Sequence, residues 1–139
     1  MIVLDTNVVS EAMRPNANGR VLDWLNAQDV RTLHLTATSL AELAFGIAAL
    51  PEGRRKTDLR ERLRATQDRV FADRILPFDA QAAHAYAERM AMAPADGRGI
   101  GQCDGQIAAI AAANGMIVAS RDIGPFRAMG VEVIDPWTA

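Results

Sequence analysis

The segment MIVLDTN, residues 1–7, places a carboxylate, a hydroxyl and an amide directly after an apolar run. The apolar residues 2–4 predict a short buried strand, and residues 8–13 predict a helical turn that ends before Pro15. Three polar side chains, those of Asp5, Thr6 and Asn7, therefore stand where the first predicted strand ends.

The rest of the chain continues this alternation of short apolar segments and helical segments. Further strands are predicted at 32–36, 75–78, 116–119 and 131–134, and helices at 19–28, 39–50, 54–71, 80–92 and 102–114. The glycines and proline of residues 94–99 predict a loop. The alternation indicates an α/β fold with a mainly parallel central sheet of about five strands flanked by helices.

Composition narrows the class of protein. The 139 residues, half of them apolar, fit one globular domain spanning 1–139. The net charge of −2 gives no overall attraction to polyanions. Cys103 is the only cysteine, so no internal disulfide can form, and no apolar stretch is long enough to span a bilayer. We expect a cytoplasmic protein without a membrane partner.

Four carboxylates are predicted to meet at one edge of this sheet, because sites in parallel sheets form at the carboxyl ends of the strands. Asp5 follows the first strand, and Asp122 follows the fourth by three residues. Glu42 is expected in the first turn of the helix after the second strand. The helix that carries Asp104 runs back to the fourth strand with only Gly115 between them, so its first turn lies at the same edge.

Like charges held close together in a partly dry cleft either retain a proton or bind a cation. An all-oxygen set favours Mg²⁺ or Mn²⁺. Each residue also has a structural interpretation. Asp5 would form an Asx turn, Glu42 would complete a capping box with Ser39, and Asp104 and Asp122 would be N-terminal caps or partners of the helix dipole. Convergence of all four favours the metal site.

Four segments resemble the PIN-domain nucleases, in particular toxins of the VapC type and their FitB-like branch. They are VLDTNVVSE at 3–11, TSLAELAFGI at 38–47, CDGQIAAIAAANG at 103–115 and ASRDIGPF at 119–126. The resemblance implies that Asp5, Glu42, Asp104 and Asp122 are the catalytic acids, with Asp5 and Asp104 as metal ligands. It also implies that Thr6, Asn7 and Ser120 support the site. Many relatives carry a further acid where Pro125 stands, so Asp122 alone forms the fourth corner here.

The function implied by this resemblance is a Mg²⁺- or Mn²⁺-dependent endoribonuclease that hydrolyses RNA phosphodiester bonds. Similar proteins are the toxins of toxin-antitoxin pairs, are inhibited by a cognate small antitoxin with a DNA-binding half, and form homodimers. The alternative is a catalytically silent PIN-like binding module that works only through its partner complex on DNA. An aspartyl-phosphate phosphatase is disfavoured because Asn7 stands where its second Asp would be required.

Positive charge is concentrated in residues 54–74, which carry eight basic against four acidic side chains. This segment would bind phosphates or an acidic antitoxin segment, or it would form a solvated face with pairs such as Asp58 and Arg62. Arg14 and Arg121 lie near the proposed site and would contact phosphate or pair with a neighbouring acid.

Cys103 is interpreted as a buried structural cysteine rather than as a nucleophile served by a histidine. Trp137 is interpreted as a packing residue, because no basic and aromatic side chains alternate near it.

Overall fold

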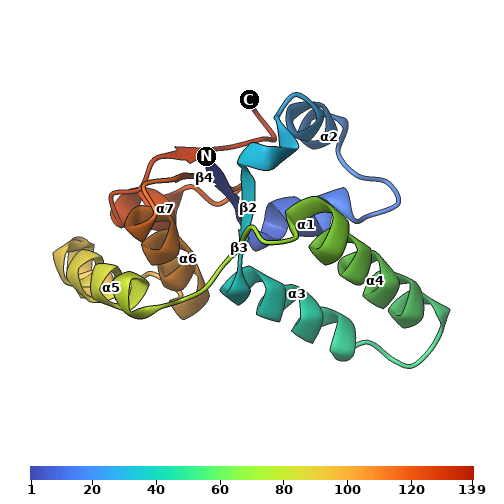
Figure 1. Ribbon diagram of the computed structural model, residues 1–139. Coiled ribbons are helices and arrows are strands. Elements are labelled where there is room, and N and C mark those ends of the chain that lie inside the picture. The colour runs from blue at the N-terminus through green and yellow to red at the C-terminus, as the bar shows by residue number, and fades with distance from the viewer.

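A central parallel sheet of five strands organises the protein. The computed structural model describes residues 1–139. The strands lie in the order β3-β2-β1-β4-β5 and every neighbouring pair is parallel. This confirms the predicted α/β fold with a parallel five-stranded sheet, which Figure 1 shows with its helices. The strands are β1 (Ile2–Leu4), β2 (Leu33–Thr36), β3 (Ile75–Leu76), β4 (Ile117–Ala119) and β5 (Val133–Ile134).

The first strand is the centre of the sheet. Val3 pairs with His34 of β2 on one side and with Val118 of β4 on the other. Ladder pairing continues past the strand, because the Asp5 N–H donates to the Ala119 carbonyl at 2.9 Å. All three residues of β1 are also buried, so helices cover both of its faces. This explains its uninterrupted apolar sequence.

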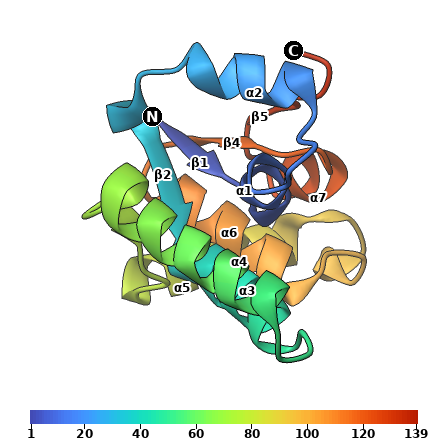
Figure 2. The ribbon, with the colours of Figure 1, turned by 90° about the vertical axis from the view of Figure 1, so that its right-hand side faces the viewer.

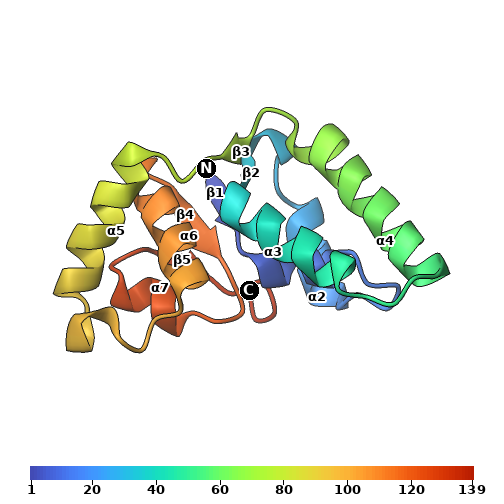
Figure 3. The same ribbon diagram turned by 90° about the horizontal axis from the view of Figure 1, so that it is seen from below.

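Helices cover both faces of the sheet. Figure 3 shows α5, α6 and α7 gathered on one side and α2 and α4 on the other. The two helices α3 and α4 extend from the sheet as a contacting pair (Figure 2). The α-helices are α1 (Thr6–Ala12), α2 (Gly19–Asn26), α3 (Ala37–Ala48), α4 (Arg54–Ala65), α5 (Ala80–Met92), α6 (Gln102–Ala113) and α7 (Gly124–Ala128). None of them is long and apolar enough to cross a membrane.

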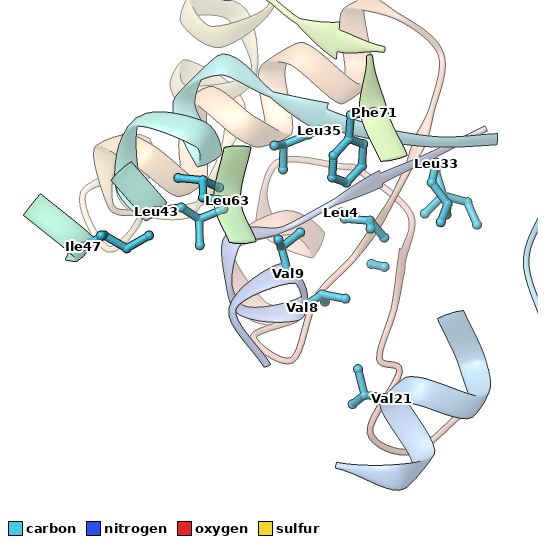
Figure 4. Packing of buried hydrophobic residues seen from close by; sticks show 12 residues of the cluster. Leu4, Val8, Val9, Val21, Leu33, Leu35, Leu43, Ile47, Leu63 and Phe71 are labelled. Atoms are coloured by element: carbon cyan, nitrogen blue, oxygen red, sulfur yellow. The ribbon is translucent and has the colours of Figure 1, made fainter. Parts of the chain in front are cut away.

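The alternation of side chains along β1 divides the core in two. Ile2 and Leu4 join the larger cluster, which Figure 4 shows packed between the sheet and the first four helices. Val3 points to the opposite face and packs against Ile107 and Phe126, of α6 and α7. A one-residue shift in register would exchange the two faces and place Ile2 and Leu4 where Val3 packs, so the register of β1 is set by the fit of these side chains in the two clusters.

Close packing of α5 on α6 requires glycine directly after Asp104. A Cβ at Gly105 would lie 2.9 Å from Cε2 of Tyr86 and 3.0 Å from Cε of Met90. Such distances are too short for ordinary contacts, so a side chain at position 105 would displace the Tyr86 ring and the Met90 methyl group from their packed positions.

Most predicted segments occur within two or three residues of their expected ends, and the departures have local causes. The strand predicted at 75–78 stops at Leu76, because Pro77 has no N–H for the ladder. The charged helix ends as α-helix at Ala65 and continues as a π-helix over Thr66–Phe71. The helix α7 was not predicted, since five residues that include Gly124 and Pro125 show no helical periodicity. Pro94–Gly97 forms a 3₁₀ segment in which Ala95 and Asp96 have positive φ.

Candidate active site

The carboxylate of Asp5 is held at the carboxyl end of the central strand. Only 4% of the residue is exposed. Its Oδ1 accepts from the Thr6 N–H at 2.7 Å, which caps α1, and its Oδ2 accepts from the Ser120 hydroxyl at 2.7 Å. Asp5 thus fills the structural role of a helix cap and also faces the end of β4, 115 residues further along the chain.

Burial destabilises the charged form of Asp5. Desolvation raises the pKa of Asp5 from 3.8 to about 6, against the opposing effect of the hydrogen bonds from Ser120 and Thr6. The negative charges of Asp104 and Glu42 contribute a smaller part of this rise. The carboxylate therefore lies in an environment that a nearby cation would stabilise.

Glu42 is oriented by a hydroxyl from the α1 helix. The Thr6 hydroxyl donates to Oε1 of Glu42 at 2.7 Å and lies 3.0 Å from the hydroxyl of Ser39. The predicted capping box is wrong, because α3 begins two residues earlier than expected and Thr36 caps it by accepting from the Ser39 N–H at 2.9 Å. Glu42 accordingly lies in the second turn of α3 rather than the first, and its carboxylate is not used as a cap.

Asp104 and Asp122 complete the set from the other side of β1. Asp104 lies in the first turn of α6, and desolvation, followed by the charges of Asp122 and Glu42, raises its pKa. Asp122 follows β4, and its backbone N–H donates to the Ser120 hydroxyl at 3.0 Å. Neither acid is an N-cap, because the N-cap residues of α6 and α7 are Gly101 and Ile123, but Asp104 lies in the first turn of α6, where the helix dipole favours a negative charge.

The four acids form one electrostatic cluster. The charge of Glu42 acts on both Asp5 and Asp104, and Asp104 in turn is coupled to Asp5 and Asp122. None of the four belongs to any of the three ion pairs in the protein. As the side chains stand, no group of three or more Asp, Glu, His or Cys side chains is arranged to hold a metal ion. The donor chemistry of the four carboxylates nevertheless fits a hard cation, which binds oxygen ligands from side chains and water.

Cys103 is exposed, so its interpretation as a buried cysteine is wrong. It lies in the first turn of α6, whereas the buried residues of that helix begin at Gly105. Desolvation, and then the negative charge and hydrogen bonding of Glu42, raise the pKa of its thiol. A thiol with a raised pKa is a poor nucleophile at neutral pH, which disfavours Cys103 as the nucleophile.

The remaining polar residues at the site form a connected network. The side-chain amide of Asn7 donates to the Ser120 hydroxyl at 3.3 Å, and its Oδ1 accepts from the Arg121 N–H at 3.4 Å. The Arg121 guanidinium stacks on Trp137 with its central carbon 5.3 Å from the ring centroid. Trp137 also packs against the larger core cluster. Sequence reasoning missed this stacking, because the two residues are distant in the chain.

A groove of about 880 Å³ adjoins the acidic cluster and runs between α1, α3 and α4. Thr6 and Glu42 line its inner part, next to apolar side chains such as Leu43 and Leu59. The predicted pair of Asp58 and Arg62 does not form, because Arg62 donates instead to the Met13 carbonyl at 2.8 Å. Four arginines line the groove, namely Arg14, Arg54, Arg55 and Arg62.

Of these arginines, Arg14 was predicted to contact phosphate or pair with an acid. It pairs with Glu11 at 3.5 Å, and its side chain remains 66% exposed. The other three were expected only as part of the basic segment, although Arg55, Asp58, Leu59 and Arg62 follow a helical spacing that would have placed them on one face.

Comparison with known proteins places this arrangement in a family. The PIN domain family model matches residues 2–132. The chain is 48% identical to VapC ribonuclease Y4jK of Sinorhizobium fredii, over 99% of this chain and 98% of that protein. It is 44% identical to Toxin FitB of Neisseria gonorrhoeae, with 99% of each chain covered.

Solved structures agree with the sequence comparison. The crystal structure of FitAcB from Neisseria gonorrhoeae superposes with a TM-score of 0.93 at 44% identity, covering all of both chains. A structure of FitAB bound to an IR36 DNA fragment superposes with a TM-score of 0.92 at 44% identity, covering 99% of this chain and 96% of that one. The chain therefore belongs to the PIN-domain family, among the toxins of the VapC type.

Proposed function

We propose that the protein is a metal-dependent endoribonuclease that hydrolyses RNA phosphodiester bonds as the toxin of a toxin-antitoxin pair in the cytoplasm. The observation that carries this proposal is the cluster of four carboxylates at the carboxyl edge of the sheet, none of which has an arginine or lysine partner. The full-length similarity to a protein named VapC ribonuclease supports the substrate class.

Asp5 and Asp104 are the proposed ligands for Mg²⁺ or Mn²⁺. Both have raised pKa values because of burial and neighbouring acids, so a divalent cation would relieve the unfavourable charge on both. When bound, the cation polarises a phosphoryl oxygen and lowers the pKa of a water molecule. Ser120 fixes the direction of the Asp5 carboxylate through its 2.7 Å hydrogen bond, so Asp5 is the better oriented of the two.

Glu42 and Asp122 are proposed to position the attacking water and accept its proton. The hydrogen bond from Thr6 engages only Oε1 of Glu42, which leaves Oε2 for a water molecule. Asp122 is exposed, so it can reach solvent directly. The attacking oxygen comes from water, and no covalent intermediate on the protein is required.

The groove beside the cluster is proposed as the binding site of the cognate antitoxin. Its apolar side chains and its arginines fit an amphipathic segment with acidic residues. Such a segment would end next to Glu42 and block RNA. The complex of FitAB with DNA supports an antitoxin with a DNA-binding half.

A second copy of the chain is the other proposed partner. Phe45 on α3 is 73% exposed and Met92 on α5 is 86% exposed, although both are large apolar residues. Phe45 does not line the groove, so a homodimer through the surface of α3 that carries Phe45 would leave the antitoxin site open.

The test of the enzymatic proposal is cleavage of RNA by the purified protein, freed of any antitoxin, with Mg²⁺ or Mn²⁺ present. Asp104→Asn should lower the rate by at least about 100-fold, because it removes a proposed ligand without changing the side-chain volume. Asp73→Asn, which removes an exposed carboxylate outside the cluster, should cleave as the wild type does.

Equal cleavage by the wild type and Asp104→Asn would contradict the assignment. No cleavage by any form, with promoter DNA still bound through the antitoxin, would instead favour the silent binding module.

The antitoxin proposal is tested by co-expression with a small open reading frame sought immediately upstream of the toxin gene. Leu59→Asp places a charge among the apolar groove residues, so it should abolish co-purification of the antitoxin. Leu22→Asp on α2, outside the groove, should retain the complex. Retention of the antitoxin by Leu59→Asp would place it elsewhere on the toxin.

A further inference from the structure

Arg121 stands between two residues of the acidic site but is engaged by neither of their side chains. Ser120 is bonded to Asp5, and Asp122 belongs to the acidic cluster. The backbone N–H of Arg121 donates to Asn7, which fixes the start of its side chain at the rim of the cluster. Its guanidinium takes part in no ion pair, although Asp122 follows it directly.

The guanidinium is positioned by an aromatic ring instead. Its central carbon lies 5.3 Å from the centroid of Trp137. Stacking on a ring face neutralises no charge and uses none of the N–H donors along the guanidinium edge. The edge of Arg121 therefore keeps the charge and the fork of donors that bind a phosphate in bidentate fashion.

Trp137 itself is held in place from several directions. Its indole packs against the larger core cluster, and its backbone N–H donates to Oδ1 of Asp135 at 2.8 Å. The preceding residue, Pro136, is fully buried, and the Ala139 N–H donates to the Asp135 carbonyl at 2.9 Å. The ring is thus a fixed platform, and it lowers the entropy that Arg121 would lose on binding a ligand.

We propose that Trp137 is a positioning residue for RNA, which holds Arg121 at the rim of the acidic cluster so that its guanidinium binds a backbone phosphate flanking the scissile bond. This inference rests on RNA being the substrate. It assigns the C-terminal segment a role in substrate binding rather than in the core alone. An arginine there also offsets the repulsion between four carboxylates and a polyanion.

The test measures binding of a 5′-fluorescein-labelled single-stranded RNA by anisotropy, in the Asp104→Asn background so that the RNA stays intact. Arg121→Ala and Trp137→Leu should each weaken binding about three- to tenfold and lower the salt dependence by about 0.7 in the log-log slope. Trp137→Phe keeps an aromatic face, so it should bind within about twofold of the parent.

A double variant separates positioning from direct contact. Trp137→Leu should add nothing to Arg121→Ala, because the indole acts through the arginine. In an otherwise wild-type background, Trp137→Leu should raise KM and leave kcat within about twofold, measured at a temperature where both proteins are fully folded.

Two results would overturn the proposal. A Trp137→Leu variant that binds RNA as the parent does would show that the ring positions nothing. An effect of Trp137→Leu that persists in the Arg121→Ala background would show that the indole contacts RNA itself. Both outcomes are independent of whether RNA is cleaved, which the rates of the wild type and Asp104→Asn decide. Undetectable binding by the parent would reject this inference together with the RNA substrate.

Discussion

Replacing Asp5 by asparagine should stabilise the metal-free protein. The pKa of Asp5 is raised from 3.8 to about 6, and each unit corresponds to about 1.4 kcal/mol, so its ionisation lowers the free energy of unfolding by about 3 kcal/mol at neutral pH. Asparagine removes this penalty, but it replaces one of the two carboxylate oxygens by an NH2 group. The weakened hydrogen bond with Ser120 would cost about 1 kcal/mol. We expect a net gain on the order of 2 kcal/mol.

The gain should depend on pH with a defined sign. The folded protein binds the Asp5 proton more tightly than the unfolded chain does, so raising the pH through the window from 3.8 to about 6 destabilises the wild type. The variant has no such group. It should be about 1 kcal/mol less stable than the wild type at the acid end of this window, overtake the wild type within it, and keep a constant advantage above about pH 7.

Urea unfolding in EDTA at several pH values measures this difference. Asp73→Asn is the matched control, because it removes an exposed carboxylate of the same size, and its stability should follow that of the wild type. Saturating Mn²⁺ should then reverse the order. A cation present at 100 times its Kd stabilises the wild type by about 2.7 kcal/mol, whereas the variant lacks a ligand.

Two outcomes would refute the reasoning. A variant less stable than the wild type in EDTA at neutral pH would show that the hydrogen bonds to Asp5 outweigh its burial. An equal effect of Mn²⁺ on both proteins would show that Asp5 is not a metal ligand.

Three further predictions concern the hydrogen bond to Asp5, the exposed thiol and the apolar face of α3. Ser120→Ala removes a bond that lowers the pKa of Asp5, so an NMR titration of the metal-free variant should show this pKa rising by about half a unit or more, and an unchanged value would contradict the bond. Cys103→Ala should cleave RNA within about twofold of the wild type, because a thiol with a raised pKa is not the nucleophile; a loss of about 100-fold would reject this conclusion. Phe45→Asp should be monomeric by light scattering and Val30→Asp dimeric, since Phe45 belongs to the proposed interface; a dimeric Phe45→Asp would place that interface elsewhere.

The parallel sheet and the meeting of the acids were predictable because they depend on chain direction alone. A carboxylate that follows a parallel strand lies at its carboxyl edge wherever the strand falls in the sheet. The position of Asp104 followed from Gly115, which leaves too little chain for α6 to run in any other direction. Such inferences tolerate errors of two residues in the ends of elements, and α3 did begin two residues early.

Features that depend on which side of a helix a single residue occupies were not predictable. Cys103 and Gly105 are two residues apart, yet one is exposed and the other is buried against Tyr86. The groove could not be predicted either, because it is formed by three helices whose contact depends on packing rather than on local sequence. The stacking of Arg121 on Trp137 could not be predicted either, because it depends on the position of the final turn of the chain.

The central position of β1 determines which truncated chains can assemble the acidic cluster. The first acid of the cluster directly follows β1, but the hydroxyl that orients it is 115 residues away. A chain that stops before Ile117 lacks both β4, which flanks β1, and the last acid at Asp122. Such a chain cannot assemble the acidic cluster, so truncated products of this kind are expected to be inactive.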